Sequence, residues 1–179
     1  MAWTALLAAG AKFRAAALSA FITEVRPIHV RLGSNFDLAT ASTTLQSVTG
    51  LVVALAANTT YIVDADLVSH LATGATEDIK YGATWPTGAT VDIHASGPST
   101  TLAASTAPDM KVVFQGSATS GTTTVDFGTT TSNTTSRLRF YVANGANAGN
   151  LQIQAAQNTS GANIVTVVGG SMLFAQQAE

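Results

Sequence analysis

The sequence predicts a mainly β protein, an antiparallel jelly-roll-like β-sandwich that is preceded by an N-terminal amphipathic helix or arm. Three observations predict this fold class. From residue 43 onward, apolar and polar residues alternate over short stretches. Glycines and turn-forming dipeptides separate these stretches by about 8 to 12 residues, the spacing of a sandwich or barrel. Residues 1–42 lack this alternation, so we expect an arm and connector over 1–42 and a β-sandwich body over 43–179.

The N-terminal segment has the pattern of an amphipathic helix, because its large apolar residues share one stripe of a helical wheel. The stripe contains Trp3, Leu7, Leu18, Phe21, Ile22 and Val25. Arg14 lies in the middle of it, where its stem packs while its guanidinium reaches solvent, or where it meets an acidic group on a partner. Gly10 weakens the segment, and Pro27 ends it because the residue before a proline avoids the α region. We expect the strongest helix over 12–25, with the stripe and Arg14 acting as a partner-binding anchor.

A connector and a clear strand follow the arm. Residues 26–42 lack a sustained period and are expected to be extended. The clearest strand is TYIVDADLVSHL at 60–71, whose apolar residues point to one side and Asp64, Asp66 and His70 to the other. This pattern indicates a half-buried strand.

The remaining body sequence predicts further strands separated by turns. They are expected at 44–48, 51–56, 79–85, 90–95, 111–115, 123–127, 137–143, 150–156 and 163–175. Two stretches rich in Ser, Thr and Gly, 96–108 and 116–135, are expected as exposed loops or edge segments at one end of the sandwich.

Charge is sparse and unevenly distributed. Charged residues make up 10% of the 179 residues, far below the roughly 25% typical of soluble domains, and the mean hydropathy is +0.29. The 27 threonines fill part of the solvent-facing strand positions, but such a surface favours association. Residues 1–36 carry four basic residues and one acidic, a net charge of +3, whereas 37–179 carry four basic and nine acidic, a net charge of −5. We therefore expect a basic arm on a body that associates with its own copies or a larger assembly.

Composition excludes several classes of protein. The chain has no cysteine, which excludes disulfides, thiolate metal sites and cysteine nucleophiles. The longest apolar run, LVVALAA at 51–57, has the length of a strand rather than the roughly 18 to 20 residues of a membrane span. Lys12 and Arg14 follow the apolar N-terminal segment instead of preceding it, which argues against a secretion signal. The arm's basic residues are too scattered for a nucleic-acid footprint, so we expect neither a membrane nor a nucleic-acid partner.

The sequence offers few candidates for chemistry. The histidines and nearby aspartates are His29, His70, His94, Asp64, Asp66 and Asp92. Their spacing matches no metal-ligand motif such as HExxH, so we favour solvated strand faces over a metal site. Asp64 and Asp66 share a strand face at roughly 7 Å, a separation used in glycoside hydrolysis, yet adjacent outward carboxylates are ordinary. No GxSxG, P-loop or β-turn-α GxGxxG occurs, and we expect a protein that is not an enzyme and holds no cofactor.

Three aromatic residues are candidates for stacking on sugar rings. Tyr81, Trp85 and Tyr141 bind in this way if exposed, although such residues in a sandwich belong more often to the core or an interface. Pro86 places Trp85 at a strand end near a loop rim, so Trp85 is the candidate ligand-binding residue.

Gln152 and Gln154 share one face of the predicted strand 150–156. An uncharged hydrogen-bonding face is either solvated or lines a symmetry axis, where identical amides meet without like-charge repulsion. The low total charge adds weight to the second interpretation, in which both glutamines lie at an interface between copies of the chain.

Several motifs recur in order along the chain. RAAALSAFITEVRP at 14–27 follows an MAW start, and the body contains AANTTY at 56–61, EDIKYGATWPTGA at 77–89 and LQIQAAQNTS at 151–160. These resemble the small structural virion proteins of tailed phages that infect actinobacteria, with their TAAxLNxxVRDN segment, AANxxY strand start, GDIKxGxxxPxGA turn and LQxQxAQNTS strand. The first segment departs from that pattern, with Ser19 and Ala20 in place of Leu-Asn.

The resemblance implies a non-enzymatic virion component that is assembled in the host cytoplasm, a homotrimer of β-sandwiches with an N-terminal anchor. Its partners would be the major capsid protein or tail proteins, and Gln152 and Gln154 would lie at the trimer interface. Such proteins are described as capsid decoration, head fibre or minor tail proteins. We favour a capsid or head-surface position because the chain is compact, with no long shaft, and a trimer would use one short arm three times. The alternatives are a minor tail or tail-fibre protein, or a module that binds a carbohydrate, such as a host surface glycan, or another host receptor near Trp85.

Overall fold

The structure is a computed structural model of the 179-residue chain, and it describes residues 27–72, 77–100, 110–118 and 124–178. These residues form β-strands joined by turns and loops. The strands are β1 (Ile28–Arg31), β2 (Phe36–Asp37), β3 (Gln46–Leu55), β4 (Thr60–Leu71), β5 (Ile79–Thr84), β6 (Thr90–Pro98), β7 (Met110–Ala118), β8 (Thr124–Phe127), β9 (Thr134–Ala143), β10 (Gly149–Gln157), β11 (Val165–Val167) and β12 (Met172–Ala178). The prediction of a mainly β, antiparallel protein is confirmed. The predicted helix at 12–25 lies outside the described residues.

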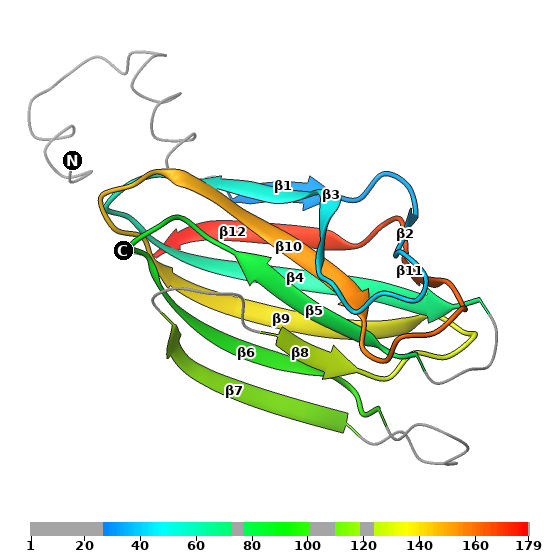
Figure 1. The fold of residues 1–179 in the computed structure, drawn as a ribbon. Helices are drawn as coiled ribbons and strands as arrows, with labels where there is room; N and C mark the ends of the chain where they lie inside the picture. The colour runs from blue at the N-terminus through cyan, green and yellow to red at the C-terminus, as the bar shows by residue number, and fades with distance from the viewer. Residues whose placement is uncertain (1–26, 73–76, 101–109, 119–123, 179) are drawn as a thin grey trace, which may run out of the picture.

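Two sheets face each other across one hydrophobic core (Figure 1). The large sheet has the strand order β1-β12-β4-β9-β6-β7, and β11 and β2 extend it beside one end of β4. The small sheet has the order β3-β10-β5-β8 and lies in front of the large sheet in Figure 1. From β3 to β10 the chain visits the sheets in the order small, large, small, large, large, small, large, small.

The core follows from the two-residue repeat of the strands. In β4 the burial alternates residue by residue from Tyr61 to Leu71, as a sheet with one covered face requires. Phe140 on β9, Phe127 on β8 and Tyr81 on β5 are among the largest fully buried side chains. Burying each of the two phenylalanine side chains contributes about 1.5 to 3 kcal/mol. The alternation that predicts the strands therefore also supplies the core that joins the sheets.

Part of the predicted connector is a strand of the sheet. Residues 28–31 form β1, which pairs with β12. In this pairing Ile28 lies opposite Ala175 and Arg31 opposite Met172. Leu32, directly after β1, is buried in the core. Four residues are too few for a periodic signal, and the pairing partner lies at the other end of the chain. The extended connector expected over 26–42 thus contains β1 and also β2.

Strand β3 contains an irregularity in its pairing with β10. The two strands expected at 44–48 and 51–56 are joined in β3, and a register shift opposite Ile153 of β10 marks the gap between them. Gly50 has a φ of +99° there, a conformation that glycine adopts at low cost. The single strand expected at 163–175 is, in contrast, divided into β11 and β12.

Strand β6 extends into the range predicted as a loop. Its last three residues, Ser96 to Pro98, form a glycine- and proline-bearing stretch that reads as a turn in sequence. Gly97 faces inward, where a Cβ atom would lie 2.6 Å from Cδ1 of Phe127. The glycine therefore permits close approach of the two sheets instead of a turn. Of the rest of that predicted loop, residues 101–108 lie outside the described part of the chain.

Candidate functional site

The outer face of the large sheet carries a ladder of two ion pairs. Asp64 and Asp66 on β4 lie opposite Arg139 and Arg137 on β9. Arg139 donates from Nε and Nη2 to the two carboxylate oxygens of Asp64 at 2.7 and 3.0 Å. Arg137 donates in the same way to Asp66 at 2.7 and 3.2 Å. Both pairs are bidentate, which fixes the planes of the guanidinium groups.

The ladder orients side chains more than it stabilises the fold. The hydrogen bonds to Asp66 and Asp64 raise the pKa of Arg137 and of Arg139, and the charges of the same carboxylates add to the effect. The two arginine side chains are nevertheless 58% and 42% exposed. Ion pairs so open to solvent contribute about 0 to 1 kcal/mol each.

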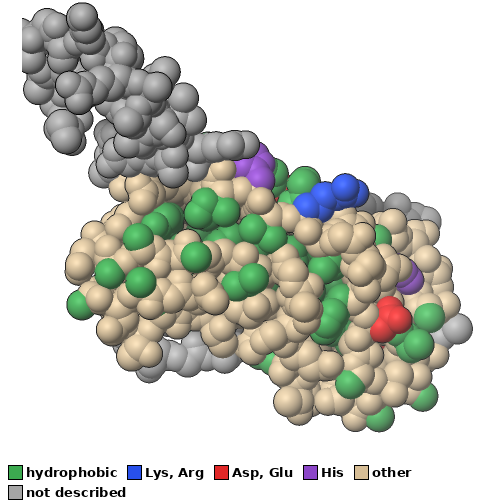
Figure 2. Space-filling view, turned by 90° about the horizontal axis from the view of Figure 1, so that it is seen from above, with side chains coloured by type: hydrophobic (Ala, Val, Ile, Leu, Met, Phe, Trp, Pro, Cys, Tyr) green, Lys and Arg blue, Asp and Glu red, His purple; other side chains and the backbone are tan. Residues whose placement is uncertain are grey.

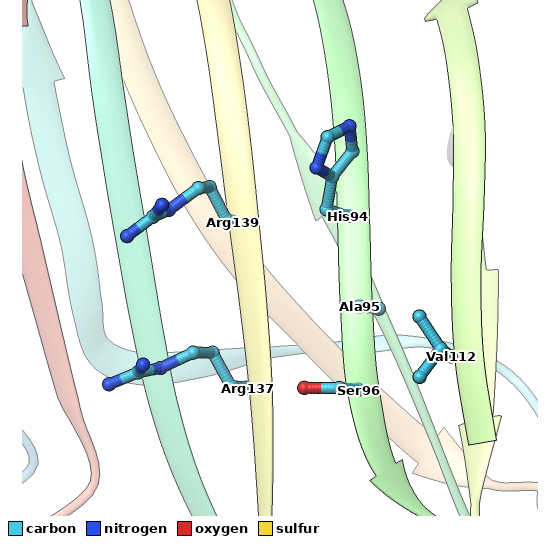
Figure 3. Close-up of a pocket in the computed structure, with 6 residues that line it drawn as sticks. All are labelled: His94, Ala95, Ser96, Val112, Arg137 and Arg139. Carbon is cyan, nitrogen blue, oxygen red and sulfur yellow. The ribbon is translucent and has the colours of Figure 1, made fainter. Parts of the chain in front are cut away.

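A small trough lies beside the ladder, over β6. It has a volume of about 220 Å³ and is lined by His94, Ala95, Ser96, Val112, Arg137 and Arg139. In Figure 3 both arginine side chains lean away from His94 and Ser96, so their aliphatic stems form one wall. Val112 on β7 stands opposite Ser96 and forms the other wall. His94 packs edge-on against Tyr141 with ring centroids 5.2 Å apart.

The ladder was not identified from the sequence, although its residues were visible there. The sequence predicts a solvated strand face for Asp64 and Asp66. The structure places both carboxylates on the outer face of β4, where each forms an ion pair with an arginine. Among the described residues no group of three His, Cys, Asp or Glu side chains is arranged to hold a metal ion. The available signal was the match between Asp-Ala-Asp in one strand and Arg-Leu-Arg, residues 137–139, in another. Using it requires knowing that these two strands are neighbours.

The outer face of the small sheet is nearly free of charge. One row runs across all four strands from Ser47 through Gln154 and Gly82 to Thr124. β3 and β10 contain no charged residue. Two charged residues, Lys80 on β5 and Asp126 on β8, are directly opposite each other at one end of the sheet, and Asp126 forms an ion pair with Lys111 of β7 at 2.6 Å. The two outer faces of the sandwich therefore differ in electrostatic character.

Figure 2 looks at the molecule from above, onto the edge of the sandwich where β1 and β3 lie in Figure 1, and shows scattered hydrophobic side chains with few charged ones.

Gln152 is bonded within its own chain. Its Nε2 donates to the backbone carbonyls of Val48, Leu51 and Ile153 at 3.0, 3.0 and 2.9 Å. These carbonyls surround the register shift of β3, where ladder pairing is interrupted. The side chain thus supplies donors that the irregular strand lacks. This bonding explains the polar residue without a symmetry axis, and an interface role of Gln152 and Gln154 stays a prediction.

The candidate aromatic residues lie in different environments. Tyr81 is fully buried, which raises the pKa of its hydroxyl and removes it from any surface site. Trp85, after the end of β5, is partly buried and packs against the core. Tyr141 is 36% exposed on the ladder face beside His94. Tyr141 is therefore the residue of the three that borders the trough.

A cluster of acidic groups joins the start of β5 to neighbouring loops. Glu77 is 5% exposed, and its Oε1 accepts hydrogen bonds from the backbone N–H of Asn163 at 3.3 Å and from its Nδ2 at 2.7 Å. Asp78 Oδ1 accepts a bond from the backbone N–H of Thr129 at 3.0 Å. Burial raises the pKa of Asp78, the charges of Asp126 and Glu77 raise it further, and the Thr129 bond lowers it. Asp78 also has a φ of +46°.

We expect Asp78→Asn to stabilise the protein at neutral pH. The folded-state pKa of Asp78 lies above its ordinary value of 3.8, so the native state holds the proton more tightly and stability falls as pH rises through the interval between the two values. Asparagine removes that buried charge, keeps an acceptor for Thr129 and tolerates positive φ. Allowing for solvent screening of a half-buried group, the gain is under about 1 kcal/mol.

Thermal unfolding of both proteins across the acid range checks this expectation. The gain should appear at pH 7 and vanish below pH 3.8, the ordinary value for the group. An Asn variant that is less stable at pH 7 would show that the charged bond to Thr129 outweighs the burial of the carboxylate.

The predicted anchor residues lie outside the described part of the chain. This holds for the stripe from Trp3 to Val25 and for Arg14, so their role stays a prediction. Among the described residues there is no helix with the length and apolar character needed to cross a membrane.

Comparison with known proteins assigns no family to the chain. No family model and no curated protein matches it. The similar solved structures come from virus particles. The structure of the Gt strain of infectious bursal disease virus is 12% identical, with a TM-score of 0.23 over 86% of this chain and 42% of the viral chain. The VP2 subviral particle of the same virus is 10% identical, with a TM-score of 0.22 over 86% and 37%. The chain spans less than half the length of these viral chains, and TM-scores this low assign it neither a family nor a function.

Proposed function

We propose that this chain is a non-enzymatic structural protein of a phage particle, a jelly-roll sandwich that decorates the capsid or head surface. In this proposal the N-terminal arm, residues 1–26, binds the major capsid protein. The body associates with two further copies into a homotrimer. The virion is then its place of function. A position on the tail, as a minor tail or tail-fibre protein, is the alternative attachment.

The strand order is the observation that carries the proposal. A jelly roll folds eight strands into two facing four-stranded sheets through two Greek keys. Strands β3 to β10 give the orders β3-β10-β5-β8 and β4-β9-β6-β7, with the alternation between sheets that such a fold requires. β12 and β1 then continue the second sheet beyond β4. Viral capsid and lectin domains use this architecture, and the ordered sequence motifs support the first of these two classes over the second.

The charge distribution supports association through the small sheet. Residues 37–179 carry a net charge of −5, so identical bodies repel one another at long range. Contact is least opposed where no charged group lies, and the outer face of β3 and β10 is such a surface. Its central row, with Ser47, Gln154 and Gly82, is uncharged. We place the trimer contact on this face.

Gln154→Glu tests the trimer contact directly. Around a threefold axis the substitution places three carboxylates close together, and like charges at short range are strongly unfavourable. The full-length chain is expected to have three times the mass of the 18.2 kDa monomer, and the variant is expected to be monomeric. Light scattering after size-exclusion chromatography measures both masses. Gln154→Leu, which adds no charge, is the matched control and is expected to stay trimeric.

If the Gln154→Glu variant keeps the trimeric mass of the wild type, the trimer contact does not lie on the outer face of the small sheet. A wild-type chain that is monomeric would remove the trimer itself, while leaving attachment through the arm to be tested separately.

A further inference from the structure

We propose that the trough beside His94 binds one neutral sugar ring, as a single unit of a glycan chain. The proposal concerns the large-sheet face and goes beyond a structural role in a particle. It rests on the size, charge and lining of the trough.

The size of the trough limits the ligand to a small group. Its volume is about 220 Å³, below the roughly 300 to 1,000 Å³ of sites that enclose drug-sized ligands. The trough is shallow and lies along the open face of the large sheet (Figure 3). One ring therefore fits, and neighbouring units of a longer chain extend into solvent.

The charges around the trough favour a ligand without net charge. Two arginines alone would suggest an anion site, but each already bonds a carboxylate. Asp92 lies on the same face, opposite Tyr141. The acidic and arginine side chains on this face are the three carboxylates of Asp64, Asp66 and Asp92 and two guanidinium groups, whose formal charges sum to −1. An anion would meet these carboxylates and a cation the guanidinium groups, whereas a neutral ligand avoids both penalties.

The lining offers both kinds of contact that a sugar ring uses. Val112 is 57% exposed and, with the stems of Arg137 and Arg139, provides apolar walls for the C–H face of the ring. The hydroxyl of Ser96 both donates and accepts hydrogen bonds, and the His94 ring forms part of the lining beside it. The ion-pair ladder keeps the arginine stems in place, because each guanidinium is held by two bonds. The site is thus preorganised on rigid strands instead of loops.

A titration followed by NMR tests the proposal on the full-length protein. The probes are the methyl glycosides of glucose, galactose, mannose and arabinose, each up to about 50 mM, because a single shallowly bound ring is expected to have a dissociation constant on the order of 1 to 10 mM. At least one neutral glycoside is expected to give saturable shifts of the amides of His94, Ser96 and Val112. Methyl glucuronide and glucosamine, which carry one negative and one positive charge, are expected to bind at least about fivefold more weakly.

Matched variants locate the binding. Ser96→Ile fills the trough and is expected to weaken binding by at least about tenfold. Ala143→Ile adds the same side chain at an exposed position of β9 on the same face, beyond Tyr141, and is expected to bind as the wild type does. Val112→Ser, at an exposed edge position, removes an apolar wall and is expected to weaken binding several-fold.

Three outcomes would overturn the inference. They are no saturable shift with any neutral glycoside, tightest binding by the glucuronide, or undiminished binding in both Ser96→Ile and Val112→Ser. The second would make the trough an anion site, and the third would place the sugar elsewhere on the surface. The trough lies on the large sheet and the proposed trimer contact on the small sheet, so failure here leaves the proposed virion role intact.

Discussion

Gln152→Glu is expected to lower the free energy of unfolding by about 3 kcal/mol or more at neutral pH. The amide of Gln152 donates to the carbonyls of Val48, Leu51 and Ile153. A carboxylate has no proton to donate, so the two N–H donors that these three partly buried carbonyls share are lost, and a negative charge is placed beside the carbonyls. Leaving one buried acceptor unsatisfied costs about 1 to 3 kcal/mol, and charge increases the penalty. Chemical denaturation of the two proteins measures the difference.

Gln154→Glu is the matched control for this prediction. It introduces the same carboxylate two residues further along β10, opposite Gly82 and Ser47. Its effect on unfolding should be small once association is accounted for, for example at concentrations where both variants are monomeric. The Gln152→Glu variant should also recover stability on acidification. The carbonyls around residue 152 favour the protonated carboxyl, which can donate one hydrogen bond, so the folded-state pKa of the new group is raised. Equal destabilisation by both substitutions would contradict the assignment of Gln152 to the β3 irregularity.

Deleting residues 2–36 is expected to unfold or severely destabilise the body, whereas deleting residues 2–26 is not. The longer deletion removes β1 and Leu32, which is 4% exposed. It also breaks two backbone bonds, from Leu32 N–H to the Ser171 carbonyl at 2.8 Å and from Gly170 N–H to the Leu32 carbonyl at 2.7 Å. Truncating one buried leucine to alanine already costs about 2 to 5 kcal/mol. The shorter deletion leaves all of these contacts in place.

Circular dichroism and thermal unfolding of the two truncated chains distinguish these expectations. The chain that begins after residue 26 should show a cooperative transition near that of the full-length protein. If removing β1 leaves the transition unchanged, its pairing with β12 contributes no stability and the body begins later than the structure indicates.

Strand bounds could be predicted from the sequence where apolar and polar residues alternate over a long stretch. β4 matches its predicted bounds of 60–71, because twelve residues of strict alternation leave no competing period. β9 alternates over most of its length, and its predicted range, 137–143, lies within the observed strand. The ranges predicted for β5 and β10 are also within one residue of the observed bounds, although their alternation is shorter. Their inward residues could be named as the core before the strand order was known, since one face of each strand must be covered.

Features that depend on distant partners were not predictable. β1 is four residues long and exists because β12 offers it an edge. Gly97 indicated a turn, whereas its lack of a side chain serves the approach of Phe127. The ladder of Asp64 and Arg139 required the knowledge that β4 and β9 are neighbours. In each of these places the deciding contact joins residues far apart in sequence, which local patterns do not record.

For the candidate site residues too, the sequence indicates individual residues, whereas their partners are known only from the structure. The sequence places Gln152 and Gln154 at an interface between copies, which stays a prediction, whereas the structure shows Gln152 bonded to carbonyls in the irregular part of β3. The trough combines residues of β6, β7 and β9, three strands whose order in the sheet only the structure provides. The sequence predicts Trp85, which precedes a proline, as a candidate ligand-binding residue. Its packing against the core favours a structural role.

The most direct test of the proposed function is the amount of this chain in purified particles produced from the genome that encodes it. Quantitative mass spectrometry would compare the full-length chain with the chain lacking residues 2–26, each relative to the major capsid protein. We expect the full-length chain in a fixed ratio to the capsid protein and the shortened chain, although folded, to be absent. Particles that lack the full-length chain, or that hold both forms in the same ratio, would contradict the proposal.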